Sequence, residues 1–365
     1  MKNTFGNNIS VTLFGESHGE AIGAVLDGLS PGIKIDYEYI KNKLSLRRPV
    51  GRISTARREQ DDFKIVSGVF NGKSTGTPIC IIIENKDIKS EVYEAVEGIA
   101  RPGHADYTAH VKYSGFEDFR GGGHFSGRIT AALVAVGAIL QQALEDKGIF
   151  IGTHIKECAS IKDVEFSNLE KEIKNLNSID FALIDESKKA EMVEAIEKAA
   201  SEEDSVGGIL ETAVIGVPAG VGEPWFDSVE GNLSHILFSI PAIKGVEFGA
   251  GFNLANMRGS EANDSFYADE GVIKTKTNNN GGINGGITNG MPIVFRCVVK
   301  PTPSISKEQN SVAMNIKKNV ILSTIGRHDP AIVHRARVVV DSVTAICLAD
   351  LLATKFGTDF LRNDK

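Results

Sequence analysis

The chain has few of the residues that would place it in several common protein classes. Among its 365 residues there are four cysteines, Cys80, Cys158, Cys297 and Cys347, which lie far apart in apolar segments. This spacing excludes a disulfide framework and contains no paired metal-ligand motif, so we expect buried, reduced thiols and no metal site. Basic residues number 40 against 47 acidic ones, so nucleic acid is not expected as the main partner.

Long apolar runs and targeting segments are also missing. The first ten residues, MKNTFGNNIS, contain no hydrophobic signal core. We find no apolar run of the ~18 residues that a membrane span requires. No proline- or serine-rich linker divides the chain. We therefore expect a soluble, cytoplasmic protein that does not associate with membrane and whose residues 1–365 form a single domain.

The hydrophobic pattern predicts an α+β fold. Strand-like runs occupy residues 9–16, 63–70, 78–85, 207–218 and 290–301, and helical spacing occupies residues 36–48. Residues 130–148 and 332–357 are apolar almost all round, which is typical of helices buried on several sides, whereas residues 186–204 predict a surface helix. We expect sheets to cover the two buried helices. Each half has strands followed by a buried helix, so an internal duplication is left open.

Three loops combine a histidine with glycine or proline turns. They are GESHG at residues 15–19, RPGHADYT at 101–108 and GRHDP at 326–330. Histidine is the side chain whose ordinary pKa allows proton transfer near neutrality, and loops on a rigid scaffold commonly carry such groups. A hydrogen-bonded structural histidine is the alternative for each loop.

A basic segment, LRRPVGRISTARRE at residues 46–59, contains Arg47, Arg48, Arg52, Arg57 and Arg58. Segments rich in arginine most often form a solvent-exposed basic surface, which is the alternative here. Proline and glycine interrupt this one, however, so no single helical face organises the arginines. Planar guanidinium groups suit carboxylates and phosphates, and the segment therefore favours a small substrate with several anionic groups.

Two segments are rich in glycine. FRGGGHFSGR at residues 119–128 directly precedes an expected buried helix, so its backbone N–H groups can face an anion. NNNGGINGGITNG at residues 278–290 is also consistent with a flexible low-complexity loop. Neither segment matches a P-loop or a dinucleotide-binding fingerprint.

Together these segments resemble the chorismate synthase family along nearly the whole chain. The segments FGESHGEAIGAVLDGLSPG, RREQDDFKIVSGVFNGKSTGTPI, RPGHADYT, IKGVEFGAGF, NGGINGGITNG, KPTPSI and GRHDP follow the family's order. The resemblance implies a carbon–oxygen lyase that forms chorismate from 5-enolpyruvylshikimate 3-phosphate by 1,4-elimination of phosphate. It implies reduced FMN as the cofactor, although no net oxidation occurs. It also implies a β-α-β sandwich, with a central helical layer between two largely antiparallel sheets, and a homotetramer.

The resemblance implies roles for individual residues. His18, with Ser17 beside it, would protonate the leaving phosphate, His104 would keep reduced flavin correctly protonated, and Asp329 would relay a proton from the flavin. Positively charged contacts to the substrate, or to NADPH, are expected from Arg48, Arg52, Arg128 and Arg327. Flavin contacts are expected from His124, Phe125, Ser126, Pro241, Ala242, Gly285, Lys300, Pro301, Thr302, Pro303, Ser304 and Arg327.

The chain departs from the common family residues at three of these positions. His124 and Phe125 stand where an arginine and a serine are usual, and Pro241, which lacks a backbone N–H, stands where an asparagine is common. A flavin-independent phosphatase or phosphotransferase and a non-catalytic flavin-binding protein are the alternative classes. Reduction of the flavin by NADPH on this chain, or by a separate reductase, is also left open. The chain shows no added domain, so we expect external reduction.

Overall fold

The computed structural model describes residues 2–49, 51–54, 60–86, 97–324 and 329–362. Two five-stranded sheets form its frame, and every strand pair in them is antiparallel. The first sheet contains, in spatial order, β1 (Thr4–Phe5), β2 (Ser10–Gly15), β3 (Ala21–Asp27), β7 (Ile79–Glu84) and β4 (Phe63–Ser67). The second contains β11 (Ile243–Phe248), β16 (Ile293–Val299), β10 (Gly208–Ile215), β8 (Phe150–Cys158) and β9 (Ile161–Lys162).

Helices and small hairpins complete the fold. The α-helices are α1 (Tyr37–Ser45), α3 (Asp106–Tyr113), α4 (Thr130–Glu145), α5 (Leu169–Leu176), α6 (Lys189–Ser201), α7 (Val229–Leu237), α8 (Gly259–Ala262) and α9 (Val333–Phe356). The hairpins pair β5 (Val69–Phe70) with β6 (Lys73–Ser74), β12 (Phe266–Asp269) with β13 (Val272–Thr275), β14 (Ile283–Asn284) with β15 (Ile287–Thr288), and β17 (Gln309–Ala313) with β18 (Lys318–Leu322). The elements predicted from the hydrophobic pattern are confirmed, and so is a mixed α/β fold with antiparallel sheets.

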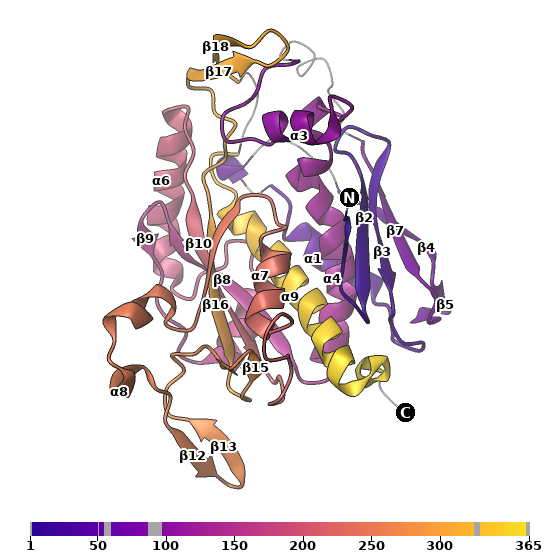
Figure 1. Cartoon of the computed structure of the whole chain (residues 1–365), viewed down its shortest axis with the longest axis vertical. Helices are drawn as coiled ribbons and strands as arrows, with labels where there is room; N and C mark the ends of the chain where they lie inside the picture. The colour runs from indigo at the N-terminus through magenta and orange to yellow at the C-terminus, as the bar shows by residue number, and fades with distance from the viewer. Residues whose placement is uncertain (1, 50, 55–59, 87–96, 325–328, 363–365) are drawn as a thin grey trace.

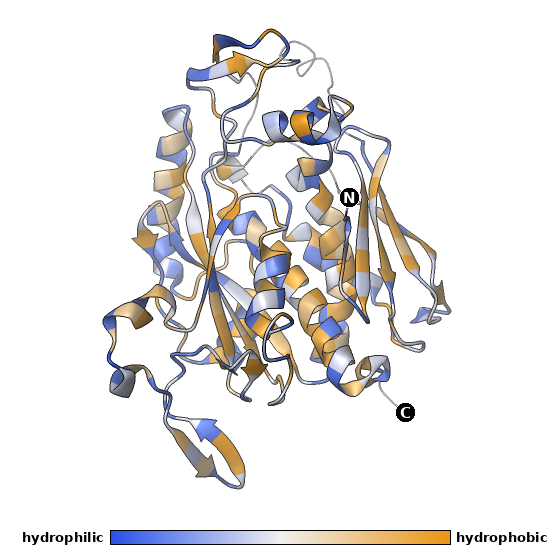
Figure 2. Ribbon diagram, in the orientation of Figure 1, coloured by the Kyte–Doolittle hydropathy of each residue, from blue (hydrophilic) through white to orange (hydrophobic). Residues whose placement is uncertain are grey.

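The two apolar helices lie between the sheets (Figure 1). α4 packs on β3 and β7, α9 packs on β8 and β10, and the helices pack on each other. In α4, 14 of 16 residues are buried, and in α9, 20 of 24, so neither helix has a polar face. By contrast, α6 is amphipathic, because it buries Met192, Ile196 and Ala199 on one face and exposes its charged residues (Figure 2).

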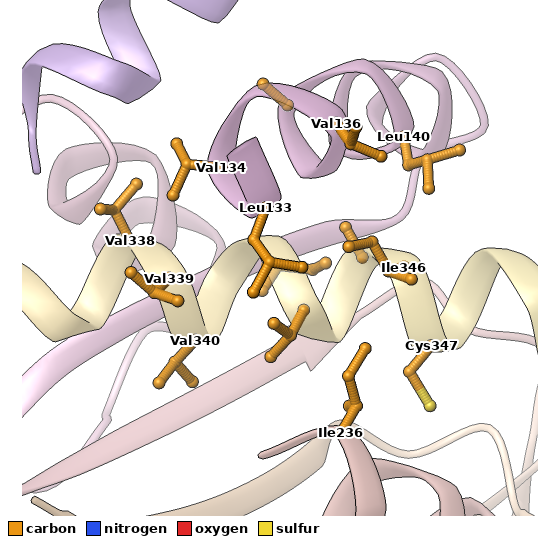
Figure 3. Close-up of a cluster of buried hydrophobic side chains, with 14 of the residues drawn as sticks. Leu133, Val134, Val136, Leu140, Ile236, Val338, Val339, Val340, Ile346 and Cys347 are labelled. Carbon is orange, nitrogen blue, oxygen red and sulfur yellow. The ribbon is translucent and has the colours of Figure 1, made fainter. Parts of the chain in front are cut away.

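The α4–α9 contact forms the middle of the hydrophobic core. Leu133 and Val134 of α4 face Val338 and Val339 of α9 (Figure 3). The two backbones come close at Gly137, where a built Cβ would lie 2.4 Å from Cβ of Ser342. Burial of each large aliphatic side chain contributes roughly 1.5–3 kcal/mol to the stability of the fold. The α4–α9 contact therefore fixes the position of the two helices relative to each other.

Two expectations need correction. Cys80 is only half-buried, although Cys158, Cys297 and Cys347 are buried and all four thiols are unpaired. A stretch of 19 residues, Gly127–Glu145, is long and apolar enough to span a membrane by length and composition. This differs from the expectation that the chain contains no such run. In the folded chain, 89% of that window is buried, as in the core helix of a soluble protein.

Candidate active site

The triple-glycine loop lies against both predicted catalytic histidines. Its segment η2 (Arg120–Phe125) is not a regular helix, because Gly121, Gly122 and Gly123 have positive φ of 63°, 109° and 52° and kink the chain. A Cβ built on Gly121 would lie 2.1 Å from Cε1 of His18, and one built on Gly122 would lie 3.1 Å from Cε1 of His104. Glycine is therefore required here for both conformation and space, and the loop brings the two imidazoles to neighbouring positions.

His18 and Ser17 are buried at the turn after β2. The Ser17 hydroxyl donates to the carbonyl oxygen of Arg120 at 3.3 Å, and it lies 3.1 Å from Nδ1 of His18. Because the hydroxyl has one proton, it accepts from His18, and Nδ1 therefore bears hydrogen. Backbone N–H of Ser17 also donates to the carbonyl of Gly123 at 3.1 Å, which ties the GESHG turn to the glycine loop.

His104 lies just before α3 and is held by an acidic neighbour. Its Nδ1 is 2.7 Å from Oδ1 of Asp106. Arg101 donates to the same carboxylate from Nη2 at 2.7 Å and from Nε at 2.8 Å. Burial alone would raise the pKa of Asp106, but the hydrogen bonds from Arg101 and His104 outweigh it and hold the pKa well below its usual range.

A cavity of about 510 Å³ opens on one side of this loop. His104, Gly122, His124 and Phe125 line it. Nδ1 of His124 donates to the carbonyl of Gly15 at 2.7 Å, and Phe125 packs edge-to-face on Tyr113 with ring centroids 6.1 Å apart. The other charged and aromatic residues that line the cavity include Glu16, Glu97, Asp106, Glu117, Asp118, Phe14, Phe116 and Phe119. This lining suits a flat ring better than a phosphate, because carboxylates outnumber cations in it.

The predicted basic segment joins the N-terminal ends of α4 and α9. Nε of Arg47 donates to the hydroxyl of Thr130, the first residue of α4, at 2.9 Å. Nε of Arg335, in the first turn of α9, donates to the carbonyl of Arg47 at 2.9 Å. Both helices therefore direct their N-terminal ends, which favour anions, toward this segment.

The arginines of the predicted binding set are placed differently from one another. Arg48 donates from Nη2 to the carbonyl of Gln60, and its Nε is buried with no partner among the described residues. Arg52 lies in the 3₁₀ segment η1 (Gly51–Ile53). Arg57, Arg58 and Arg327 fall outside the described residues.

Arg128 is buried and paired, which sequence reasoning did not predict. Its Nη1 donates to Oδ1 of Asp61, and its Nε donates to Oδ1 of Asn85 at 3.0 Å. Nδ2 of Asn85 in turn donates to the carbonyls of Glu16, at 3.0 Å, and Gly19, at 2.8 Å. Arg128 thus supports the turn that carries His18. Asp61 has a positive φ of 53°, a conformation that the sequence EQDDF does not signal.

Asp329 is joined to the predicted flavin segment through the neighbouring Pro330 and the hydroxyl of Ser205. Nη1 of Arg335 donates to Oδ2 of Asp329 at 2.7 Å. The next residue, Pro330, accepts at 2.8 Å from the N–H of Val206, whose neighbour Ser205 donates to the carbonyl of Thr302 at 2.8 Å. Residues 300–304 therefore lie beside the loop that carries Asp329.

Lys300 connects that segment with His104 and with Ala242. Its N–H donates to the carbonyl of Ala242 at 3.0 Å, and its Nζ donates at 2.5 Å to the carbonyl of Gly103, the residue before His104. Burial, assisted by Lys244, lowers the pKa of Lys300. Pro241 is exposed beside Ala242, which itself adopts a positive φ of 77°.

Gly285 lies far from this cluster within one chain. It is an exposed residue in the turn between β14 and β15. Thr288 of that hairpin accepts from the N–H of Gly220, and Gly220 accepts from Nζ of Lys355 in the last turn of α9. Asp329 lies at the opposite end of this 24-residue helix, which is about 36 Å long (Figure 1).

Two imidazoles on glycine turns, next to arginines and two helix N-termini, form an arrangement suited to proton transfer on an anionic substrate. A family model described as chorismate synthase matches residues 9–353. Chorismate synthases from Thermococcus kodakarensis and Pyrococcus abyssi are 46% and 47% identical over 347 residues, covering 95% of this chain and 96% of each relative. A crystal structure of chorismate synthase aligns with a TM-score of 0.78 and 31% identity, covering 98% of this chain and 95% of that one.

The chain belongs to the chorismate synthase family. It is accordingly a lyase of aromatic amino-acid biosynthesis, and the identification made from the sequence motifs is confirmed.

Proposed function

We propose that this site converts 5-enolpyruvylshikimate 3-phosphate to chorismate, with reduced FMN bound. The C–O bond to phosphate and a ring C–H bond at the other end of the allylic system break, a second ring double bond forms, and phosphate and a proton leave. The observation that carries the proposal is the contact of one glycine loop with both His18 and His104, beside the helix N-termini and the basic segment.

The residues present fit the ring of a flavin, because aromatic side chains line the cavity of about 510 Å³. The Thr302 hydroxyl, which does not line that cavity, is buried with no partner among the described residues. Ser126, Ala242 and residues 300–304 would hold the cofactor together with His124 and Phe125, while Pro241 and Arg327 complete the proposed set. Reduced FMN would supply electron density to the allylic system when bound.

The protein's own groups would hold the substrate and manage protons. His18, oriented by Ser17, would place a proton on the departing phosphate, whose charge would otherwise be costly to leave in a closed site. His104 would hold a proton at the flavin edge, and Asp329 would accept one. Arg48 and Arg52 would bind the anionic groups of the substrate, while Arg128 would act by supporting the His18 turn.

We further infer a duplicated β-α-β sandwich, one domain and a homotetramer. Each half supplies a five-stranded antiparallel sheet followed by a long buried helix, and one hydrophobic cluster includes residues from both halves. The projecting β12–β13 hairpin exposes Phe266, Tyr267, Val272 and Ile273 (Figure 1). Another subunit would cover such a surface. Gly285 is far from the flavin cavity of its own chain and would contact a flavin bound to that other subunit.

Unpaired thiols support a cytoplasmic location.

An anaerobic assay with substrate and chemically reduced FMN tests the activity. We expect equal amounts of chorismate and phosphate. Phosphate without chorismate, or release without flavin, would identify a phosphatase instead. A parallel reaction with oxidised FMN and NADPH, without added reductase, should give no product, because we propose external reduction.

Variants of the three proton-handling residues test the roles. His18→Ala and His104→Ala should each lower kcat by ~10²–10⁴-fold, the usual contribution of general acid–base groups, while FMN affinity is largely kept. Asp329→Asn should slow chorismate formation by removing the proton acceptor. Wild-type turnover in the Asp329→Asn variant, or in both histidine variants, would refute the proposed set.

A further inference from the structure

We propose that Asp106 is a positioning residue that fixes the tautomer of His104, and that Arg101 holds the Asp106 carboxylate in place for this purpose. The inference rests on the proposed function, because it concerns the nitrogen through which His104 exchanges its proton. Asp106 is the first residue of α3, and its side chain turns back toward the loop that precedes the helix.

Three donors and one imidazole surround the carboxylate. Oδ2 accepts from backbone N–H of Arg101 at 2.9 Å and from its Nε at 2.8 Å. Oδ1 accepts from Nη2 of Arg101 at 2.7 Å and lies 2.7 Å from Nδ1 of His104. A carboxylate only accepts hydrogen bonds, so an Nδ1 without hydrogen would place two lone pairs opposite each other.

Nδ1 of His104 therefore carries hydrogen, and Nε2 becomes the nitrogen that can gain or lose a proton. The contact of 3.2 Å between Nη2 of Arg101 and Nδ1 is longer than the bond to Asp106 and does not change this assignment. The ring edge with Cε1 and Nε2 faces the glycine loop, at 3.1 Å and 3.3 Å from a Cβ built on Gly122. Asp106 thus presents the reactive nitrogen to the glycine loop, in which the preceding residue, Gly121, packs on His18.

An asparagine at position 106 should reverse the tautomer. Two Arg101 donors converge on the Oδ2 position, so the amide oxygen would occupy it and the amide NH₂ would face His104. Nδ1 would then have to accept, and the proton would move to Nε2. Asp106→Ala should give the same result, because Nη2 of Arg101 would become the neighbouring donor.

Nitrogen NMR of the full-length protein labelled with ¹⁵N-histidine measures the tautomer directly, at a pH where the imidazole is neutral. His104→Gln identifies the signal by its loss. We expect hydrogen on Nδ1 in the wild type and on Nε2 in Asp106→Asn. With chemically reduced FMN, Asp106→Asn should lower kcat by ~10²-fold, with KM for the substrate little changed.

Asp163→Asn is the matched control. Asp163 lies 2.8 Å from Nδ1 of another histidine, His154 on β8, and does not line the cavity, so the variant alters a similar pair away from the glycine loop. We expect wild-type kcat and an unchanged His104 signal. Hydrogen on Nε2 in the wild type would overturn the proposal without any variant, as would an Asp106→Asn protein that keeps the Nδ1–H tautomer. If the wild type forms no chorismate, the proposed function fails, whereas the NMR result still decides the role of Asp106.

Discussion

Replacing Gly121 by alanine should displace His18 and so test whether the glycine loop sets the geometry of the site. The new Cβ would lie 2.1 Å from Cε1 and 2.3 Å from Nδ1 of His18, and 3.0 Å from the hydroxyl of Ser17. Ordinary carbon contacts lie near ~3.5 Å, so the imidazole or the loop would have to move by roughly 1.4 Å. A displacement of about 1 Å can cost ~10²-fold in rate.

The same substitution should also destabilise the fold modestly. Gly121 has a φ of 63°, and an L-residue in the left-handed region costs roughly 1–2 kcal/mol. We therefore expect kcat to fall by ~10²-fold while chemical denaturation shows a loss of about 1–2 kcal/mol. A loss of activity of this size cannot come from unfolding alone if the variant retains its cooperative transition.

Gly127→Ala provides the control within the same segment. A Cβ at Gly127 would meet no atom within 4 Å, and its φ is not in the left-handed region. We expect its kcat to match the wild type and its stability to stay within about 0.5 kcal/mol. The reasoning fails if Gly121→Ala is fully active, or if both alanine variants lose activity equally.

Other variants test the remaining charges and thiols. Arg48→Ala should weaken substrate binding by about tenfold to a hundredfold, since a hydrogen bond to a charged group contributes roughly 1.5–3 kcal/mol, and calorimetric titration should show a smaller loss for FMN. Individual alanine variants of the cysteines should keep kcat in steady-state assays, because burial raises the pKa of Cys158 and Cys297 to about 12 and disfavours the thiolate. Burial alone would lower the pKa of His154, but Asp163 and Glu211, at 2.8 Å and 3.0 Å, raise it. This network therefore stabilises the folded protein fully below about pH 6.5, and its contribution is lost as the pH rises through the raised pKa of folded His154. Tm should accordingly fall toward alkaline pH in the wild type and less steeply in His154→Gln.

Local patterns in the sequence predicted much of the fold. The absence of a polar face in α4 and α9 required both helices to be buried, and alternating apolar residues marked the strands that cover them. The same reasoning missed that residues 127–145 are long enough to resemble a membrane span, because apolar content alone does not distinguish a core helix from a spanning one. Cys80 was expected to be buried because its neighbours are apolar, yet it is half-buried on β7.

The candidate site was less predictable because its contacts join distant segments. His18 and His104 could be found from their glycine and proline turns, but their common contact with the triple-glycine loop depends on tertiary structure. Nothing in the sequence near Arg128 indicates that Asp61 neutralises it. Likewise, family motifs matched Gly285 to a flavin contact, whereas the fold places it at the far end of α9.

Arginine–aspartate pairs explain why arginine content overstates the number of ligand contacts. Arg47 and Arg128 share Asp61, Arg101 binds Asp106, and Arg335 binds Asp329. Each pair fastens one site loop to a neighbouring element, so these cations balance carboxylates and add little net charge for a substrate. Arg48 differs, because it donates to a neutral carbonyl and buries Nε without a partner among the described residues. Asp62 lies close enough to Arg48 for their charges to interact, but the two form no ion pair among the described residues. The guanidinium can therefore still attract a polyanion, and this is the physical reason to expect Arg48 to discriminate between the substrate and the flavin.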